Sequence, residues 1–98
     1  MKNSLDEREE ALRELQEIPG VGPTIARNLV ALGIRRVAQL RGRKPEGLYR
    51  KLERLEGGHV DRCALYVFRC AVYYAECKRP DPRLLRWWNW KDGAKTGK

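Results

Sequence analysis

The sequence predicts an all-α fold in a single compact domain. Apolar residues recur every three or four positions, the spacing of an amphipathic helix, and the strict alternation typical of strands is nearly absent. Glycine and proline fall where these periodic segments stop. A length of 98 residues suits one domain, and a composition of 42% hydrophobic and 35% charged residues is typical of a globular protein rather than a disordered one.

The first two helices are predicted from their apolar faces and their ends. The first has Leu12 and Leu15 on one face and is expected to end at Pro19, which cannot continue a helix. The second begins at Pro23, since proline is favoured in a first turn, and stops at Gly33. The segment between them is short, so the two helices form a hairpin.

The rest of the chain continues as helices separated by breaks. A short helical turn is predicted for residues 37–40, and a third full helix begins at Pro45 and ends at Gly57. The longest helix is predicted for residues 60–77. Two prolines then interrupt the chain before a tryptophan-rich segment, residues 84–90.

The longest predicted helix has two different faces when its residues are placed at about 100° intervals. Its wide apolar face predicts a central position in the core, and it comprises Val60, Ala64, Val67, Phe68, Ala71 and Ala75. The opposite stripe, named here the tyrosine stripe, comprises Arg62, Tyr66, Arg69, Tyr73 and Glu76. We favour packing of the C-terminal tryptophans (Trp87, Trp88 and Trp90) on this stripe, and the alternative is that these residues dock a protein partner or a base.

Charge is distributed unevenly along the chain. Residues 1–18 carry three basic and six acidic side chains, whereas residues 19–98 carry eighteen basic and seven acidic ones, which gives a net charge of +8. The densest stretch, residues 35–51, holds seven cations and one acidic side chain. A basic body of this strength attracts polyanions, because each neutralised phosphate releases condensed counterions.

Residues 18–23 read Ile-Pro-Gly-Val-Gly-Pro and connect the first two predicted helices. Gly20 and Gly22 allow a phosphate to approach the main chain closely, and the turn leads directly into a helix N-terminus, which favours an anion. Thr24 and Arg27 are placed to add a hydroxyl group and a cation. The turn is therefore a candidate phosphate-binding site.

The segment 15–26 resembles the helix-hairpin-helix motif, in which an apolar-Pro-Gly-apolar-Gly-Pro turn joins two helices. The resemblance implies that the turn binds the DNA backbone without sequence specificity. In this family the hairpin sometimes holds a monovalent cation through carbonyl groups, which here would be those of Ile18 and Val21. Thr24 departs from the family pattern, since many members that bind DNA well carry lysine at this position.

A second hairpin is expected at residues 56–60, between the third and the longest helix. The outline resembles a paired helix-hairpin-helix domain of the SAM-like type, in which this second hairpin is degenerate. It lacks the Gly-apolar-Gly spacing, and Asp61 near the next helix start would repel phosphate. We expect the domain to span residues 1–91 and a disordered tail to cover residues 92–98.

Residues 10–92 are also similar to a narrower family, the small bacterial pathogenicity-locus or mitomycin-resistance-type proteins, which contain a helix-hairpin-helix. The segments 61–70 and 87–92 carry most of this similarity. The similarity implies the same fold, and it hints at a role in DNA repair or stress tolerance.

These observations predict a protein that binds DNA without sequence specificity, with RNA as a less favoured ligand. The residues expected to contact or attract the backbone are Gly20, Val21, Gly22, Thr24, Arg27, Arg35, Arg36, Arg41, Arg43 and Lys44. The alternative is a protein-interaction or dimerisation module, a possible homodimer, that uses the tyrosine stripe and the C-terminal tryptophans.

We expect neither catalysis nor a cofactor, because the chain has one histidine and no carboxylate cluster suited to a divalent metal. The three cysteines (63, 70 and 77) are spaced about 10.5 Å apart along a helix and cannot share one metal ion. No apolar run approaches the roughly 20 residues of a membrane-spanning helix, and no signal-peptide pattern is present. The expectation is a cytoplasmic protein without a membrane partner.

Overall fold

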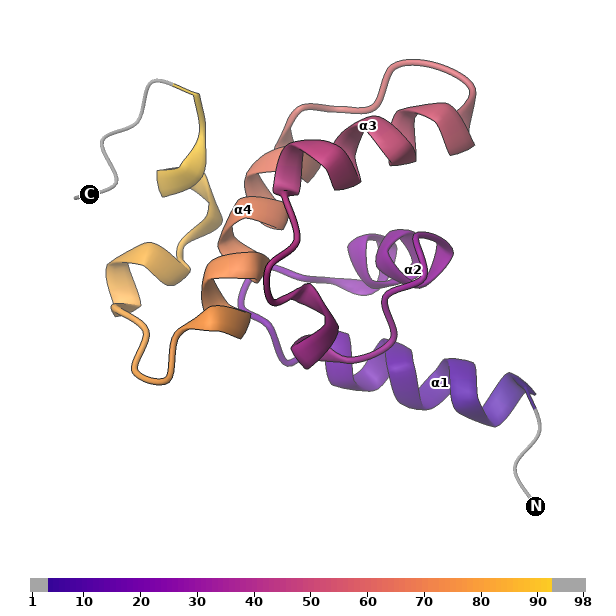
Figure 1. Cartoon of the computed structure of the whole chain (residues 1–98), viewed down its shortest axis with the longest axis horizontal. Coiled ribbons are helices and arrows are strands. Elements are labelled where there is room, and N and C mark those ends of the chain that lie inside the picture. Colours follow the sequence, from indigo (N-terminus) through magenta and orange to yellow (C-terminus); the bar gives the residue numbers. More distant parts are fainter. Residues whose placement is uncertain (1–3, 93–98) are drawn as a thin grey trace.

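The computed structural model describes residues 4–92 of the chain. These residues form helices joined by turns and loops, and no strand occurs among them. The α-helices are α1 (Ser4–Leu15), α2 (Pro23–Ala31), α3 (Pro45–Glu56) and α4 (Cys63–Glu76). The 3₁₀-helices are η1 (Val37–Leu40), η2 (Pro82–Leu85) and η3 (Trp87–Trp90). Figure 1 shows α4 between the hairpin of α1 and α2 and the C-terminal segment that carries η2 and η3. The predicted all-α class is confirmed for the described residues.

Two helix ends differ from the sequence prediction. Helix α1 ends at Leu15, before the proline of the turn, because the amides of Glu17 and Ile18 donate to carbonyl groups only three residues back and tighten the chain. Helix α4 begins at Cys63 instead of residue 60. There the carboxylate of Asp61 accepts the N–H of Cys63, the first residue of the helix, at 2.8 Å and satisfies one of the free amides of this helix end.

Helix α4 is the centre of the hydrophobic core. Five of the six residues predicted for its apolar face are buried, and the sixth, Val60, precedes the helix and is partly exposed. The burial extends further round the helix than predicted, to Leu65, Cys70 and Val72. The other elements close around α4 with apolar side chains, among them Leu15, Leu29, Leu40, Leu48 and Leu52.

The described helices are short, and the longest, α4, has 14 residues. A transmembrane helix needs about 20 predominantly apolar residues. No helix within residues 4–92 combines the length and the apolar character needed to cross a membrane.

A tight turn over residues 18–21 joins α1 to the start of α2. The N–H of Val21 donates to the carbonyl of Ile18 at 3.0 Å, and Gly20 between them has a φ of +88°. Proline followed by a glycine with positive φ is the pattern of a type II turn. The side chains of Ile18 and Val21 are buried, so the core fixes the shape of this turn.

The C-terminal segment packs against the same turn. A Cβ atom added to Gly20 would lie 3.0 Å from Cδ1 of Trp87, closer than an ordinary van der Waals contact. Behind them, Sγ of Cys70 lies 3.9 Å from the carbonyl oxygen of Pro19 and 3.6 Å from that of Leu84. The turn, helix α4 and the C-terminal segment therefore form one packed unit.

The tail predicted for residues 92–98 is described only at its first residue, and residues 93–98 lie outside the described part of the chain. Asp92 forms ion pairs with Arg62 at 2.6 Å and with Arg69 at 3.1 Å, both on the side of α4 that carries the tyrosine stripe. Asp92 is thus attached to the body of the domain.

Replacing Gly20 by alanine is expected to destabilise the fold by about 3 kcal/mol, because the new Cβ strains a positive φ and displaces Trp87. Urea unfolding followed by circular dichroism measures the loss. Gly33→Ala is the matched control, since Gly33 has a φ of +90° but open space around its α-carbon. The free energy of unfolding of this control should fall only by the smaller cost of the positive φ. Equal losses of stability in the two variants would contradict the importance of the Trp87 contact.

Candidate nucleic-acid interface

The N-terminus of α2 is open to an anion. Gly22 is its N-cap residue and provides no side chain, and Pro23 has no N–H group. The N–H groups of Gly22, Thr24 and Ile25 have no acceptor among the described residues. A Cβ atom added to Gly22 would have no heavy atom within 4 Å. Unpaired amides at the positive end of a helix dipole are a favourable environment for a phosphate.

The other α-helix N-termini whose first turns are described differ from this one. Helix α3 has Glu46 in its first turn, and the carboxylate of Asp61 occupies the N-terminus of α4. The N–H of Cys63 lowers the pKa of Asp61, which keeps this carboxyl group charged. Among α2, α3 and α4, only the start of α2 lacks a carboxylate, as the sequence predicted for the first hairpin relative to the second.

The predicted hairpin residues have different surroundings. Thr24 and Arg27 are exposed on α2, and Arg27 forms no ion pair with any described residue. The side chain of Val21 is buried and its N–H is used within the turn, so Val21 offers no amide to a ligand. Gly20 is held against Trp87. The open part of the predicted site is therefore formed by Gly22, Thr24 and Arg27.

The carbonyl groups of Ile18 and Val21 are the ones that the family resemblance assigns to a monovalent cation. The oxygen of Ile18 already accepts the N–H of Val21 at 3.0 Å, which leaves one lone pair for a cation. No group of three or more histidine, cysteine or acidic residues in the described part of the chain is arranged to hold a metal ion.

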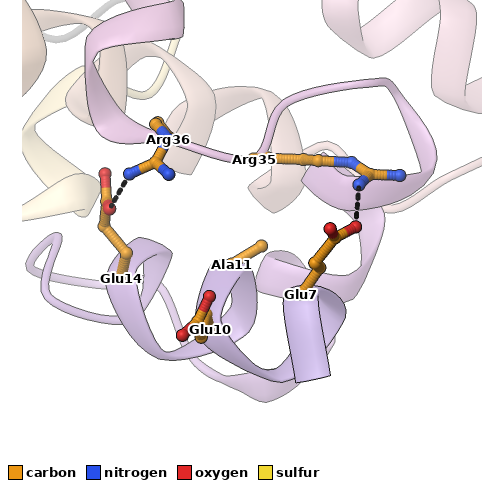
Figure 2. Close-up of a pocket in the computed structure, with 6 residues that line it drawn as sticks. All are labelled: Glu7, Glu10, Ala11, Glu14, Arg35 and Arg36. Atoms are coloured by element: carbon orange, nitrogen blue, oxygen red, sulfur yellow. Dashed lines mark ion pairs between the residues drawn. The ribbon is translucent and has the colours of Figure 1, made fainter. Parts of the chain in front are cut away.

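Two of the predicted basic residues face the acidic helix α1. Figure 2 shows Arg35 and Arg36 opposite the carboxylates of α1 across a pocket. Arg35 pairs with Glu7 at 3.9 Å and Arg36 with Glu14 at 3.6 Å. Glu14 also accepts the N–H of Val37 at 2.8 Å. The positive charge of this loop is therefore partly neutralised by α1, a pairing that was not predicted from the sequence.

The remaining predicted cations are Arg41, which is held by a hydrogen bond to α4, and Arg43 and Lys44, which are not. Arg41 donates its Nε–H to the carbonyl of Ala75 at 2.9 Å. It thereby pairs one of the carbonyl groups that lack a partner within the last turn of α4. Arg43 and Lys44 are exposed and form no ion pair with the described residues. These two side chains, unlike Arg41, are available to a polyanion.

Three further cations, which the sequence analysis left out of the site, lie on the exposed side of α3. Arg50 and Arg54 lie one turn apart on the helix face opposite the buried Leu48 and Leu52, and Lys51 lies at the edge of that face. None of the three forms an ion pair among the described residues. Together with Arg43 and Lys44, which directly precede the helix, they are named here the α3 basic face. Helical spacing within α3 was the signal in the sequence for its three helical members.

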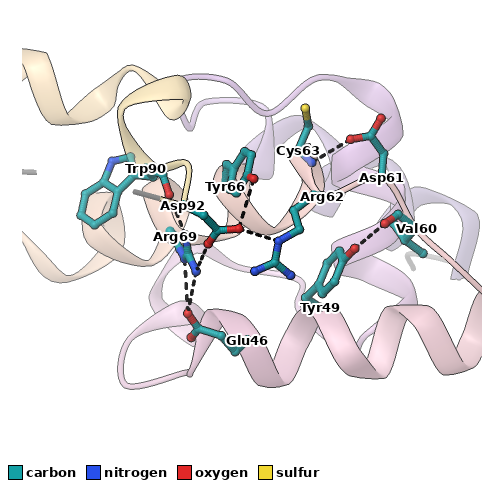
Figure 3. Close-up of polar contacts among 10 residues, drawn as sticks. All are labelled: Glu46, Tyr49, Val60, Asp61, Arg62, Cys63, Tyr66, Arg69, Trp90 and Asp92. Atoms are coloured by element: carbon teal, nitrogen blue, oxygen red, sulfur yellow. Dashed lines mark hydrogen bonds and ion pairs between the residues drawn. The ribbon is translucent and has the colours of Figure 1, made fainter. Parts of the chain in front are cut away.

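A polar network attaches the C-terminal segment to α4 and α3. Figure 3 shows the carboxylate of Asp92 between Arg62 and Arg69. Arg69 also pairs with Glu46 of α3 at 3.2 Å and donates to the carbonyl of Trp90 at 2.7 Å. Hydrogen bonds from Arg62 and Arg69, together with the charges of both guanidinium groups, lower the pKa of Asp92 to about 2. The charges of Arg62 and Arg69 are therefore balanced by carboxylates of the same domain.

The same segment covers the tyrosine stripe. The ring of Trp90 lies 5.4 Å from that of Tyr73, and the hydroxyl oxygen of Tyr73 accepts the N–H of Asp81 at 2.8 Å. Tyr66 donates to the carboxylate of Asp92 at 3.3 Å. The structure thus agrees with the favoured interpretation for Trp90, whereas Trp87 packs against Gly20 and Trp88 is exposed.

The three cysteines have separate environments and form no disulfide. Cys70 is buried, and burial raises the pKa of its thiol to about 11. Cys63 is exposed, and its hydrogen bond with Asp61 raises the pKa of its thiol as well. Neither thiol is activated as a nucleophile, since activation requires a lowered pKa.

Comparison with known proteins matches residues 8–96 to the family Cdd1, described as pathogenicity locus. The mitomycin resistance protein McrB of Streptomyces lavendulae is 34% identical over 77 residues, which cover 79% of this chain and 70% of that relative. No solved structure matches the chain. The matched family region includes the hairpin, the α3 basic face and the C-terminal segment.

The contribution of Asp92 to stability is expected to disappear in acid. Its pKa of about 2 in the folded state lies below the ordinary value of about 3.9 for an unfolded chain. The stabilisation is therefore complete above about pH 4 and is lost as the pH falls toward 2. Thermal unfolding of the protein and of Asp92→Asn at several pH values measures it. The melting temperatures should differ at pH 7 and converge near pH 2, and a constant difference would exclude this role.

Proposed function

The chain belongs to the pathogenicity locus family, and we propose that it binds the sugar-phosphate backbone of DNA without reading the base sequence. The site is the turn of residues 18–23 together with the first turn of α2. RNA carries the same phosphates and is the less favoured ligand, because the turn resembles hairpins that bind DNA.

The open N-terminus of α2 is the observation that carries the proposal. Three amides without acceptors lie at the positive end of a helix dipole, and no carboxylate is present to satisfy them. Gly22 leaves the approach free of side-chain atoms. The exposed Thr24 hydroxyl and the Arg27 guanidinium lie on the same helix within one turn. Such an arrangement binds phosphate and carries no information about base sequence.

We also propose that the fold is a paired helix-hairpin-helix domain of the SAM-like type. The support is that α1 and α2 form one hairpin, and that α3 and α4 form a second one around residues 56–60. Asp61 provides an internal anion for the second hairpin. The first hairpin would then bind the backbone, and the second would complete the core.

The α3 basic face adds long-range attraction to this proposal. Its five cations form no ion pairs among the described residues, whereas Arg35 and Arg36 share their charge with α1. The overall charge of +8 has the sign that a polyanion requires. For the cellular context we propose stress tolerance or DNA repair, since the name of the relative from Streptomyces lavendulae states mitomycin resistance.

The alternative, a protein-interaction module, has less support. It relied on the tyrosine stripe and the C-terminal tryptophans, and Tyr66, Tyr73 and Trp90 are engaged with one another or with Asp81 and Asp92. Only Trp88 of this group remains an exposed large hydrophobic residue.

Replacing Gly22 by aspartate is expected to abolish DNA binding and to raise the stability of the fold by about 0.5 kcal/mol. Gly22 has a φ of −95° and a ψ of −172°, the extended backbone that an N-cap residue adopts. A carboxylate there would accept the free amides and occupy the place of the phosphate. Fluorescence anisotropy with two labelled duplexes of unrelated sequence measures binding, and thermal unfolding measures stability.

Gly58→Asp is the matched control, because it adds the same charge at an exposed glycine of the second hairpin with open space around it. It should weaken binding by no more than about twofold, since screening limits the effect of a distant surface charge. Unchanged affinity in Gly22→Asp, or an equal loss in both variants, would argue against the hairpin as the binding site.

Arg27→Ala is expected to weaken binding to both duplexes equally and to reduce the slope of log K against log salt by about 0.9, the value of one phosphate contact. Arg35→Ala removes the same charge from a side chain that already pairs with Glu7, so the slope should change less. Titrations at four or more salt concentrations separate the two variants. A larger change for Arg35→Ala would move the binding surface from the hairpin to the surface that Arg35 shares with α1.

A further inference from the structure

The three tryptophans of the C-terminal segment have different surroundings. Trp90 donates its indole N–H to the carbonyl of Leu84 at 2.7 Å, and Trp87 is partly buried against the core. Trp88 is 50% exposed. The fold therefore uses Trp87 and Trp90 and leaves Trp88 on the surface.

The exposed ring of Trp88 is nevertheless held in place. It meets the ring of Trp87 edge to face, with centroids 5.8 Å apart and an angle of 84°. The residue after it, Asn89, donates its backbone N–H to Arg86 at 2.9 Å and its side-chain amide to the carbonyl of Arg83 at 2.7 Å. An aromatic ring positioned in this way loses little conformational freedom when a ligand binds.

Trp87 connects the exposed ring of Trp88 to the hairpin turn. The pyrrole ring of Trp87 contacts the turn at Gly20, where a Cβ would be only 3.0 Å away. The same Trp87 ring contacts Trp88 on η3. One side chain thus separates the exposed ring from the turn that leads into the open N-terminus of α2.

The surroundings of Trp88 fit a nucleobase better than a protein partner. Arg86 and Lys91 flank η3, are exposed and form no ion pair with the described residues, which favours an anionic ligand. Leu55 at the end of α3 is the only other exposed large hydrophobic residue in the described part of the chain, so no contiguous apolar patch is formed. A stable protein interface needs about 1,000 Å² of complementary surface, whereas a base needs one ring face.

We infer that Trp88 stacks on an unpaired base of DNA whose backbone is held by the hairpin. The preferred ligand is then DNA in which a single-stranded segment adjoins a duplex. This inference rests on the function proposed above, because the hairpin must hold the backbone for Trp88 to reach the neighbouring base.

The test compares a blunt duplex with the same duplex that carries a single-stranded overhang containing 2-aminopurine, a base whose fluorescence reports stacking. The protein should bind the overhang DNA about tenfold more tightly than the blunt duplex, because one base stacked on an aromatic side chain contributes an effect of this size. Trp88→Ala should remove this preference and the 2-aminopurine signal while leaving the blunt-duplex affinity unchanged. Trp88→Phe should restore part of both.

Leu55→Ala is the matched control, since it removes the other exposed apolar side chain and should change neither affinity. An overhang preference that persists in Trp88→Ala would overturn the inference and leave the hairpin proposal intact. Loss of binding to both DNAs in Gly22→Asp, with the preference intact in the unaltered protein, supports the hairpin independently. Absence of binding by the unaltered protein to either DNA would overturn both proposals. Concentration-dependent self-association that Trp88→Ala abolishes without any effect on DNA would assign Trp88 to a contact between copies and overturn the inference.

Discussion

The rest of the structure depends on one constraint, which is that the apolar residues of helix α4 must be shielded from solvent. Eight of its 14 residues are buried, so solvent can touch it along only a narrow strip. Helix α3 and η1 pack against it, the turn of the hairpin touches it at Cys70, and the 3₁₀-helices η2 and η3 cover much of what remains. In a chain of 98 residues few apolar side chains are available for this task, and large indole rings bury much area per residue. The C-terminal segment is therefore a second layer of the core.

The distribution of charge follows from the same packing. The carboxylates of Glu7, Glu14 and Asp92 lie against arginines of the same domain, whereas the exposed cations of α2 and α3 and those beside η3 form no ion pair with the described residues. Exposed ion pairs contribute at most about 1 kcal/mol each to stability. Their larger effect is on the electrostatic potential, because they remove positive charge from one surface and leave it on another.

The sequence predicted local features well and long-range pairings poorly. Periodicity and turn residues identified the four α-helices and η1, because each is a local property of the chain, whereas the 3₁₀-helices η2 and η3 were not predicted as helices. The turn between α1 and α2 could be found from its glycines and prolines. The pairing of Arg35 with Glu7 could not be predicted, since it depends on how α1 packs against a loop distant in sequence. The α3 basic face could have been found, because helical spacing alone places its cations together. Which tryptophan stays exposed depends on tertiary contacts, so the sequence did not distinguish Trp88 from its neighbours.

The two glycines of the hairpin are constrained in different ways, and this difference bears most directly on function. Gly20 is required by the fold, because its positive φ and its contact with Trp87 exclude a side chain. Gly22 has an ordinary φ and open space around it, so neither backbone geometry nor packing demands glycine there. Serine, aspartate or asparagine at this N-cap would stabilise α2, and glycine leaves its amides unpaired. A position that departs from the locally most stable choice without a structural reason is a mark of a functional site. Under the function proposed above, a phosphate that pairs with those amides would supply the reason that the fold does not.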